Sequence, residues 1–220
     1  MHTDEVRQKT IEHVIGLFHA DRAAADGMAQ EFAGRGLQGR FVQHDIKEDL
    51  RHGPLADLLS GMELEDLVLV NNASPGFVPK PFHQIAWEEY QQLLDINLKG
   101  AIHCIQFVLP RMLALRRGTI VNVLSSAVAT FPKGFAAYVA AKCSLEGLSK
   151  VLAEEYQGRG VRVISVTPGF MDTALTRAWP PILREAVLHG KQPDDPESVA
   201  RFILAVARGA STGQGCGSPR

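Results

Sequence analysis

The sequence predicts an α/β fold in which a doubly wound parallel sheet carries helices on both faces. Short β-type runs alternate with longer helix-type segments along the chain, as expected of parallel strands joined by helical crossovers. The run at residues 67–70 is apolar throughout, which is typical of a strand buried on both faces. The 220 residues, 45% of them hydrophobic, suffice for a full core. We find no internal repeat or linker and expect a single domain over residues 1–220.

The expected elements follow one another at short intervals. The first strand is expected at 14–18, followed by a helix over about 22–32 that Asp21 caps. Further strands are expected at 40–43, 67–70, 119–124 and 161–166, and the last is stopped by Pro168-Gly169. Helices are expected at 55–59, at 87–115 with a bend, at 137–156, and at 196–208 behind Asp195-Pro196.

Composition excludes several classes of function. The formal charge of −1 comes from 23 basic and 24 acidic residues, and no basic block offers a surface for nucleic acid or anionic lipid. The apolar runs fall short of a membrane span, and residues 1–5 lack the features of a secretory signal. The three cysteines and eight histidines form neither a disulfide framework nor a metal-binding pattern. We therefore expect a cytoplasmic protein without a metal.

Tyr138 and Lys142 form the most informative pair. They lie four residues apart and therefore share one face of the expected helix. The plainer interpretation is a solvated surface pair, but small residues follow Tyr138 and the stripe Leu145, Leu148 and Leu152 indicates a packed helix. A free phenol has a pKa near 10, and proton transfer at neutral pH needs that pKa lowered by up to ~3 units. A neighbouring ammonium favours the phenolate, so Lys142 is expected to lower the Tyr138 pKa.

Ser125 ends the strand before this helix, thirteen residues ahead of Tyr138. Its hydroxyl has the chemistry to polarise a substrate carbonyl, although a serine beside Ser126 also fits an ordinary turn. The ends of strands in an open α/β sheet are where ligands bind. The serine, the tyrosine and the lysine are therefore expected at a common site.

Five ordered segments together resemble the short-chain dehydrogenase/reductase family. They match in order and spacing over about 14–208, and the resemblance implies a Rossmann-like fold. The segments are Asn71-Asn72-Ala73-Ser74 after the buried strand, Asn97 within a helix, Ser125, the Tyr138–Lys142 pair, and the segment 168–173.

The resemblance implies a role for each matching residue. Tyr138 would donate or accept the proton, Lys142 would lower its pKa and hold the nicotinamide ribose, Ser125 would hold the carbonyl oxygen, and Asn97 would maintain a helix break and a water. The implied cofactor contacts are Asp45, Ile46, Asn71, Ala73, Tyr138, Lys142, Pro168, Gly169 and Thr173. The aromatic residues expected near the substrate are Phe131, Phe135, Phe170 and Trp179.

The family pattern begins with a strand, a glycine-rich phosphate loop and a helix. Such a unit needs about 30 residues, whereas thirteen precede residue 14 and read as a short polar helix. We therefore expect this unit to be missing, and with it the last strand, since residues 209–220 read as a flexible tail. A G-x-G-x-x-G pattern does occur at 34–39. It follows a helix and precedes a strand, so a helix cap and turn is the better interpretation.

The sequence leaves two functions open. The first is an NAD(P)-dependent oxidoreductase that reduces a carbonyl or oxidises a secondary alcohol at Asn97, Ser125, Tyr138 and Lys142. The second is a non-catalytic subunit or binding protein of the same descent that acts through a partner chain, because a missing phosphate loop would leave cofactor binding weak or absent. NAD and NADP stay undecided, since Asp21 suits a ribose diol and Arg22 a 2′-phosphate. The resemblance also implies a homo-oligomer, or a hetero-oligomer with an intact homologue.

Overall fold

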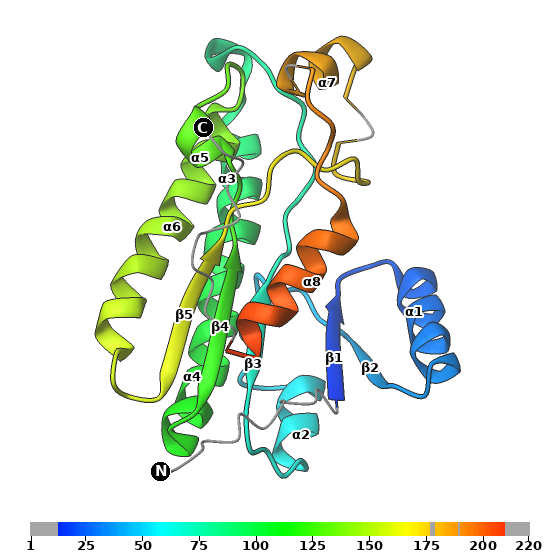
Figure 1. Cartoon of the computed structure of the whole chain (residues 1–220), viewed down its shortest axis with the longest axis vertical. Helices are drawn as coiled ribbons and strands as arrows, with labels where there is room; N and C mark the ends of the chain where they lie inside the picture. Colours follow the sequence, from blue (N-terminus) through cyan, green and yellow to red (C-terminus); the bar gives the residue numbers. More distant parts are fainter. Residues whose placement is uncertain (1–12, 177–178, 189, 210–220) are drawn as a thin grey trace, which may run out of the picture. The chain divides into compact units, whose positions relative to one another are not determined.

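The computed structural model describes residues 13–176, 179–188 and 190–209 (Figure 1). The polar helix expected before residue 13 and the tail from residue 210 lie outside these residues. The chain divides into two compact units, Met1–Met62 and Glu63–Arg220. The expectation of one domain over residues 1–220 stays a prediction.

The first unit is a parallel β-α-β arrangement. Strand β1 (His13–Phe18) pairs with β2 (Gln38–Gln43), and helix α1 (Arg22–Gly34) connects them, with α2 (Pro54–Ser60) following. The Asp21 carboxylate caps α1 by accepting a 2.9 Å hydrogen bond from the Ala24 N–H. The strands begin one and two residues earlier than expected, and both they and α1 lie where the alternating pattern predicted them.

The glycine-rich run 34–39 is a helix end and a turn. Gly34 is the last residue of α1, Gly36 adopts a positive φ of 68°, and Gly39 already lies in β2. A Cβ at Gly39 would come within 2.7 Å of the Phe32 ring, so a glycine lets helix and strand approach closely. The interpretation of this run as a turn is therefore confirmed.

The second unit contains a three-stranded parallel sheet in the order β3-β4-β5. The strands are β3 (Val68–Asn71), β4 (Gly118–Val123) and β5 (Val161–Val166). The helical elements are η1 (Phe82–Gln84), α3 (Trp87–Leu94), η2 (Asp95–Gly100), α4 (Ala101–Leu115), α5 (Ala127–Thr130), α6 (Ala136–Tyr156), α7 (Pro181–Leu188) and α8 (Pro196–Ala207). All six residues of β4 are buried, as expected of a central strand covered on both faces.

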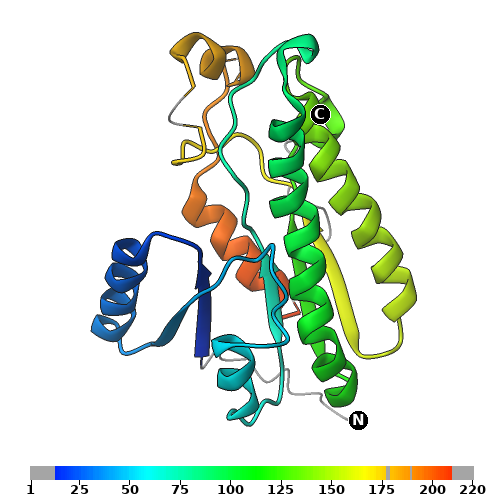
Figure 2. The same ribbon diagram turned by 180° about the vertical axis from the view of Figure 1, so that it is seen from behind.

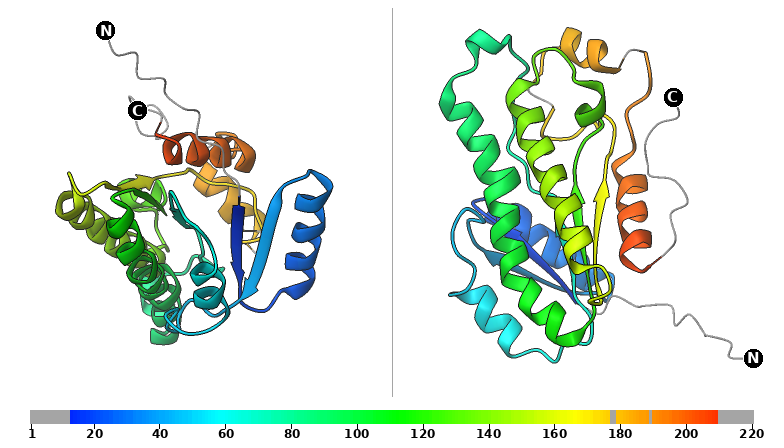
Figure 3. Two further views of the ribbon diagram at one scale, coloured as in Figure 1. Left: turned by 90° about the horizontal axis from the view of Figure 1, so that it is seen from below. Right: turned by 90° about the vertical axis from the view of Figure 1, so that its left-hand side faces the viewer.

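Helices cover both faces of this sheet. On one face, Ala101 of α4 and Leu145 of α6 pack together with Leu124, and Figure 2 shows α6 beside the α3–α4 run. On the other face, Val206 of α8 packs on Val121 and Val166 (Figure 3, left). The doubly wound α/β fold class is therefore confirmed.

The helical run Trp87–Leu115 is long and apolar enough, by length and composition, to cross a membrane. It contains Asn97, which is buried, and six buried side chains of α4 that include Phe107 and Met112. The core helix of a soluble protein passes the same test of length and composition. The run is therefore weak evidence for a membrane span.

Candidate active site

The candidate site of the second unit forms where the three parallel strands end. Ser125 follows β4, the segment from Ala73 follows β3, and the segment from Pro168 follows β5. Helix α6 begins at the same end, and its first turn carries Tyr138. Carboxyl ends of parallel strands meet at one edge of the sheet, so residues far apart in sequence come together here.

Ser125, Tyr138 and Lys142 lie together in this site. The Ser125 hydroxyl lies near enough to the Tyr138 phenol to favour its ionised form through hydrogen bonding. The Lys142 Nζ lies 5.8 Å from the centre of the Tyr138 ring and donates a 2.8 Å hydrogen bond to the Val123 carbonyl at the end of β4. Tyr138 is 8% exposed and Lys142 is 3% exposed, so the pair is packed inside the unit rather than on a solvated helix face.

Burial controls the ionisation of both groups. It raises the pKa of Tyr138, and the hydrogen bond with Ser125 acts in the opposite, lowering direction. Burial lowers the pKa of Lys142 to about 8. The expectation that Lys142 lowers the Tyr138 pKa is not met by this geometry, because desolvation is the largest effect on the phenol and a partly neutral amine attracts the phenolate less.

The buried Lys142 predicts a pH-dependent stability. Its ordinary pKa of 10.5 falls to about 8 in the folded chain, so between these values the unfolded chain binds more protons and stability rises with pH. Below pH 8 we expect Lys142→Met to be more stable than the parent by about 3 kcal/mol, and this advantage should disappear between pH 8 and pH 10.5. Urea unfolding at pH 6.5, 8 and 9.5 measures it.

Lys150→Met is the matched control, because Lys150 lies on the same helix but is exposed and paired with Glu146 at 2.7 Å. Its difference from the parent should be small at every pH. A stability difference for Lys142→Met that stays constant over the three pH values would contradict the prediction.

Asn97 lies in the π-helical turn η2, where the long helix changes its hydrogen-bonding pattern. Its side-chain amide donates a 3.0 Å hydrogen bond to the Leu93 carbonyl, one turn earlier. Its Oδ1 is buried and has no hydrogen-bond partner among the described residues. A buried acceptor of this kind needs a donor such as a water.

Asn71 is held by the sheet. Its Nδ2 donates at 2.8 Å to Asn122 Oδ1, and Asn122 Nδ2 donates at 2.8 Å to Ser149 Oγ on α6. Both Asn122 and Ser149 are buried. The chain of side-chain hydrogen bonds therefore fixes the end of β3 to β4 and α6, and Ala73 follows in the next segment.

The segment after β5 is fixed by a residue that the sequence analysis missed. Asp194, just before α8, accepts a 2.7 Å hydrogen bond from the Gly169 N–H, and its own N–H donates at 2.7 Å to the Phe170 carbonyl. The Pro168 carbonyl accepts from Ser126 N–H at 2.8 Å. The Thr173 N–H donates at 3.3 Å to Thr176. The doublet Asp194-Asp195 is visible in the sequence, but it reads only as a helix cap.

Three of the four predicted aromatic residues gather around Tyr138. Phe135, Phe170 and Trp179 belong to one apolar cluster with it. Phe131 instead has a positive φ of 47° and is 66% exposed, so the structure does not bring it to the cluster. Phe77, which the sequence analysis did not single out, stacks directly on Tyr138 with ring centres 4.5 Å apart.

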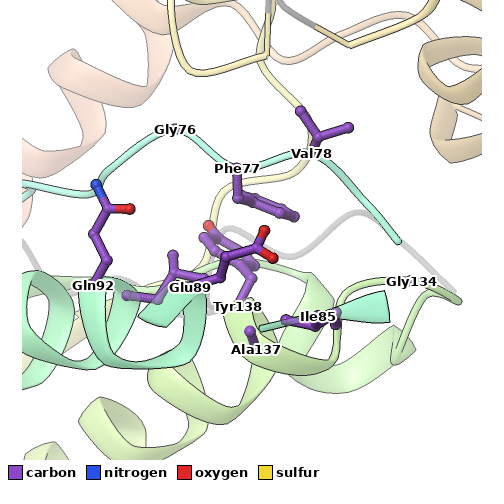
Figure 4. Close-up of a pocket in the computed structure, with 10 residues that line it drawn as sticks. Gly76, Phe77, Val78, Ile85, Glu89, Gln92, Gly134, Ala137 and Tyr138 are labelled. Atoms are coloured by element: carbon purple, nitrogen blue, oxygen red, sulfur yellow. The ribbon is translucent and has the colours of Figure 1, made fainter. Parts of the chain in front are cut away.

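A small, open pocket lies beside Tyr138 (Figure 4). Its walls come from the segment after β3, from α3 and from the start of α6, and include Phe77, Ile85 and Leu93. Glu89 adds a carboxylate that binds Lys80 Nζ at 2.6 Å. That ion pair, with a hydrogen bond from the Ala86 N–H, lowers the pKa of Glu89. The pocket thus combines apolar side chains with one ionised group.

Asp45 and Ile46 lie in the first unit, directly after β2. Although some desolvation acts the other way, hydrogen bonds and charge from Lys47 and the charge of His19 leave the pKa of Asp45 below its usual range. The Asp45 carboxylate lies 3.3 Å from Lys47 Nζ and 3.4 Å from His19 Nδ1. In the part of the chain that the structure describes, no cluster of three metal-ligating side chains occurs.

Comparisons with known proteins agree with this arrangement. A family model described as short chain dehydrogenase matches residues 12–182. The chain is 34% identical over 200 residues to 3-oxoacyl-[acyl-carrier-protein] reductase FabG of Staphylococcus epidermidis, covering 86% of this chain and 80% of that protein. It is 31% identical over 193 residues to cis-4-hydroxycyclohexanecarboxylate dehydrogenase of Sinomonas cyclohexanicum, covering 86% and 77%.

A solved structure shares the fold. A gluconate 5-dehydrogenase from Burkholderia cenocepacia, in complex with NADP and tartrate, superposes with a TM-score of 0.78 at 20% identity, covering 88% of this chain and 77% of that one. The match of the family model over most of the chain and the identity to the two enzymes lead to one conclusion. This chain belongs to the short-chain dehydrogenase/reductase family of oxidoreductases.

Proposed function

We propose that this chain is an NADP(H)-dependent enzyme that interconverts a carbonyl and a secondary alcohol, with Tyr138 as the proton donor and acceptor. The observation that carries the proposal is the meeting of three groups at the end of β4: the Ser125 hydroxyl, the buried Tyr138 phenol, and the buried Lys142 amine 5.8 Å from the phenol ring. These three groups are the ones a carbonyl reduction needs: an acid, a donor to the carbonyl oxygen and a cation near the phenolate.

In the reductive direction, Tyr138 Oη gives its proton to the carbonyl oxygen as the carbonyl carbon receives a hydride. The nicotinamide cofactor supplies that hydride when it is bound. The Ser125 hydroxyl donates to the same carbonyl oxygen and fixes its position. The proton transfer leaves a phenolate at Tyr138, and the protonated form of Lys142, 5.8 Å from the ring, offsets part of that charge. The unpaired Asn97 Oδ1 accepts from a water on the path by which a proton returns.

The donor set of the second unit fits the nicotinamide and ribose part of the cofactor. Lys142 carries up to three N–H donors and uses one of them on the Val123 carbonyl, which leaves donors for a ribose hydroxyl. Asn71, Ala73, Pro168, Gly169 and Thr173 belong to segments that follow the strand ends. In the described ranges no glycine-rich turn leads from a strand into a helix.

The residues after β1, which we expect to meet the adenosine end of the cofactor, favour a 2′-phosphate on its ribose. The Asp21 carboxylate, which would suit a ribose diol, already caps α1. Arg22 is exposed at the first turn of α1, where its guanidinium donates to Gln43 at 3.3 Å and lies over the Phe18 ring. An arginine binds phosphate with several parallel donors, and a helix N-terminus favours an anion. We therefore assign the cofactor preference to NADP.

The substrate is proposed to be a ketone or acyl-type carbonyl compound with an apolar body. The aromatic cluster around Tyr138 and the apolar walls of the pocket favour such a substrate. The similar enzymes are named for a 3-oxoacyl-[acyl-carrier-protein] and for a cis-4-hydroxycyclohexanecarboxylate. The alternative of a non-catalytic subunit is not favoured, because these relatives are enzymes. A cytoplasmic location and an oligomeric state stay predictions.

The test is turnover and binding by the purified chain. We expect loss of NADPH absorbance at 340 nm with cyclic and 3-oxoacyl ketones, and at least about tenfold preference for NADPH over NADH. Arg22→Ala should remove most of that preference. Arg35→Ala is the control, because Arg35 lies at the opposite end of α1 and pairs with Glu31. Equal use of both cofactors by the parent would contradict the NADP assignment, and absence of NADPH binding up to millimolar concentration would contradict the function.

A further inference from the structure

We propose that Phe77 is a positioning residue for Tyr138 and that Trp179 holds Phe77 in that position. The effect of this positioning on turnover rests on the proposed function. The packing of Phe77, Tyr138 and Trp179 does not, because it involves only side chains of the second unit. Phe77 belongs to the segment after β3, Tyr138 to α6, and Trp179 to the segment before α7. Three segments far apart in the sequence therefore meet at one phenol ring.

The two rings lie face to face. The ring centres of Phe77 and Tyr138 are 4.5 Å apart and their planes differ by 13°, which is the geometry of a stacked aromatic pair. Figure 4 shows Phe77 extending from its segment toward Tyr138. The Phe135 ring packs edge-on beside this pair. Its centre lies 5.2 Å from the centre of the Phe77 ring and 6.2 Å from that of Tyr138. The phenol is thus covered on one face by a single side chain.

Phe77 is fixed through its backbone as well as its ring. The Trp179 Nε1–H donates a hydrogen bond to the Phe77 carbonyl. Three residues later, the Lys80 N–H donates to the Gly134 carbonyl at 3.1 Å. The indole ring of Trp179 also packs edge-on against Phe77 at 5.2 Å. These contacts hold a loop segment that has no helix or strand of its own.

Trp179 is itself well anchored and 4% exposed. The buried Thr176 precedes it and donates through Oγ1 to the Met171 carbonyl at 3.0 Å. Arg184 of α7 binds Asp172 at 2.6 Å. Trp179 therefore has fixed neighbours in the described chain on both sides, Thr176 before it and Arg184 after it.

The cover that Phe77 gives to Tyr138 matters because burial is the largest influence on the pKa of the phenol. The polar groups that face Tyr138 are the Ser125 hydroxyl after β4, the Lys142 amine on α6, and the Glu89 carboxylate of α3, which is paired with Lys80. None of these groups changes when the Phe77 ring is removed. Removing the ring admits water to the face of the phenol, which favours the phenolate.

The test is a spectrophotometric titration of the tyrosinate band in the full-length chain. The chain has only three tyrosines, so subtracting the curve of the matching Tyr138→Phe protein isolates Tyr138. We expect Phe77→Ala to shift the titration of Tyr138 to lower pH by about one unit. Phe77→Leu keeps an apolar cover and should give a smaller shift. Trp179→Phe, which loses only the N–H donor and some ring area, should shift it in the same direction.

Phe82→Ala is the control, because Phe82 lies in the same stretch of chain, is 75% exposed and contacts Tyr90 rather than Tyr138. The titration of Tyr138 in Phe82→Ala should match that in the parent. Circular dichroism at each pH confirms that the chain is folded. Identical Tyr138 curves for the parent, Phe77→Leu and Trp179→Phe would overturn the proposal.

Turnover separates this proposal from the proposed function. If both hold, the alkaline limb of the kcat profile in Phe77→Leu moves to lower pH together with the titration. A shifted titration in a chain without turnover supports the positioning role of Phe77 and contradicts only the catalytic assignment. An unchanged titration in an active chain contradicts only the role of Phe77.

Discussion

Replacing Tyr138 with Phe is expected to lower kcat by about three orders of magnitude while leaving the fold intact. A positioned acid contributes about 10²–10⁴-fold to a proton transfer, and the phenol is the acid that the Ser125 hydroxyl contacts. The substitution keeps the ring, so the stack with Phe77 at 4.5 Å is preserved. The lost hydrogen bond costs about 1 kcal/mol of stability.

Steady-state rates with NADPH, together with the dissociation constant for NADPH, measure the effect. The dissociation constant should change by less than about threefold, because the loss is confined to the transition state. Tyr156→Phe is the control, since Tyr156 ends the same helix and lies outside the aromatic cluster. A Tyr138→Phe protein that keeps more than a tenth of the parent rate would contradict the role assigned to the phenol.

The helix that carries Tyr138 and Lys142 shows what a sequence can predict. A spacing of four residues and the apolar stripe that follows depend only on helical geometry, and α6 begins one residue from the expected position. Ser125 was predictable for a similar reason, since it follows a strand-like run, whereas Asn71 was indicated only by the family resemblance. Local periodicity is sufficient to predict the location of a residue when a single helix or strand determines that location.

The pKa values and the cover of Tyr138 were not predictable in this way. The lowered pKa of Lys142 depends on burial by other elements, which a helical pattern does not contain. Phe77 is placed by Trp179, which lies 102 residues later in the chain. The bend expected in the long helix stays a prediction; the structure has a π-helical turn there, in which Asn97 donates to the Leu93 carbonyl.

The surroundings of two glycines before β5 also depend on contacts between elements that are far apart in the sequence. Gly158 and Gly160 flank Arg159, and their φ angles are positive, 76° and 83° respectively. A Cβ at Gly158 would meet nothing within 4 Å. A Cβ at Gly160 would lie 1.9 Å from the Arg116 carbonyl oxygen and 2.4 Å from its carbon. Real Cβ atoms do not approach backbone so closely, so the chain would have to move.

We therefore expect Gly158→Ala to cost only the strain of a left-handed backbone, about 1–2 kcal/mol, and Gly160→Ala to cost about 3 kcal/mol or more beyond that. Gly160 has little freedom to shift, because its carbonyl accepts a 3.1 Å hydrogen bond from the Gly118 N–H at the start of β4. Moving it disturbs the register of Gly118 with Val161, and β5 leads directly to Pro168 and Gly169. Urea unfolding of the two variants compares the costs. Equal stabilities would mean that β5 is free to slide against β4, and the segment after β5 would then not be fixed by the sheet.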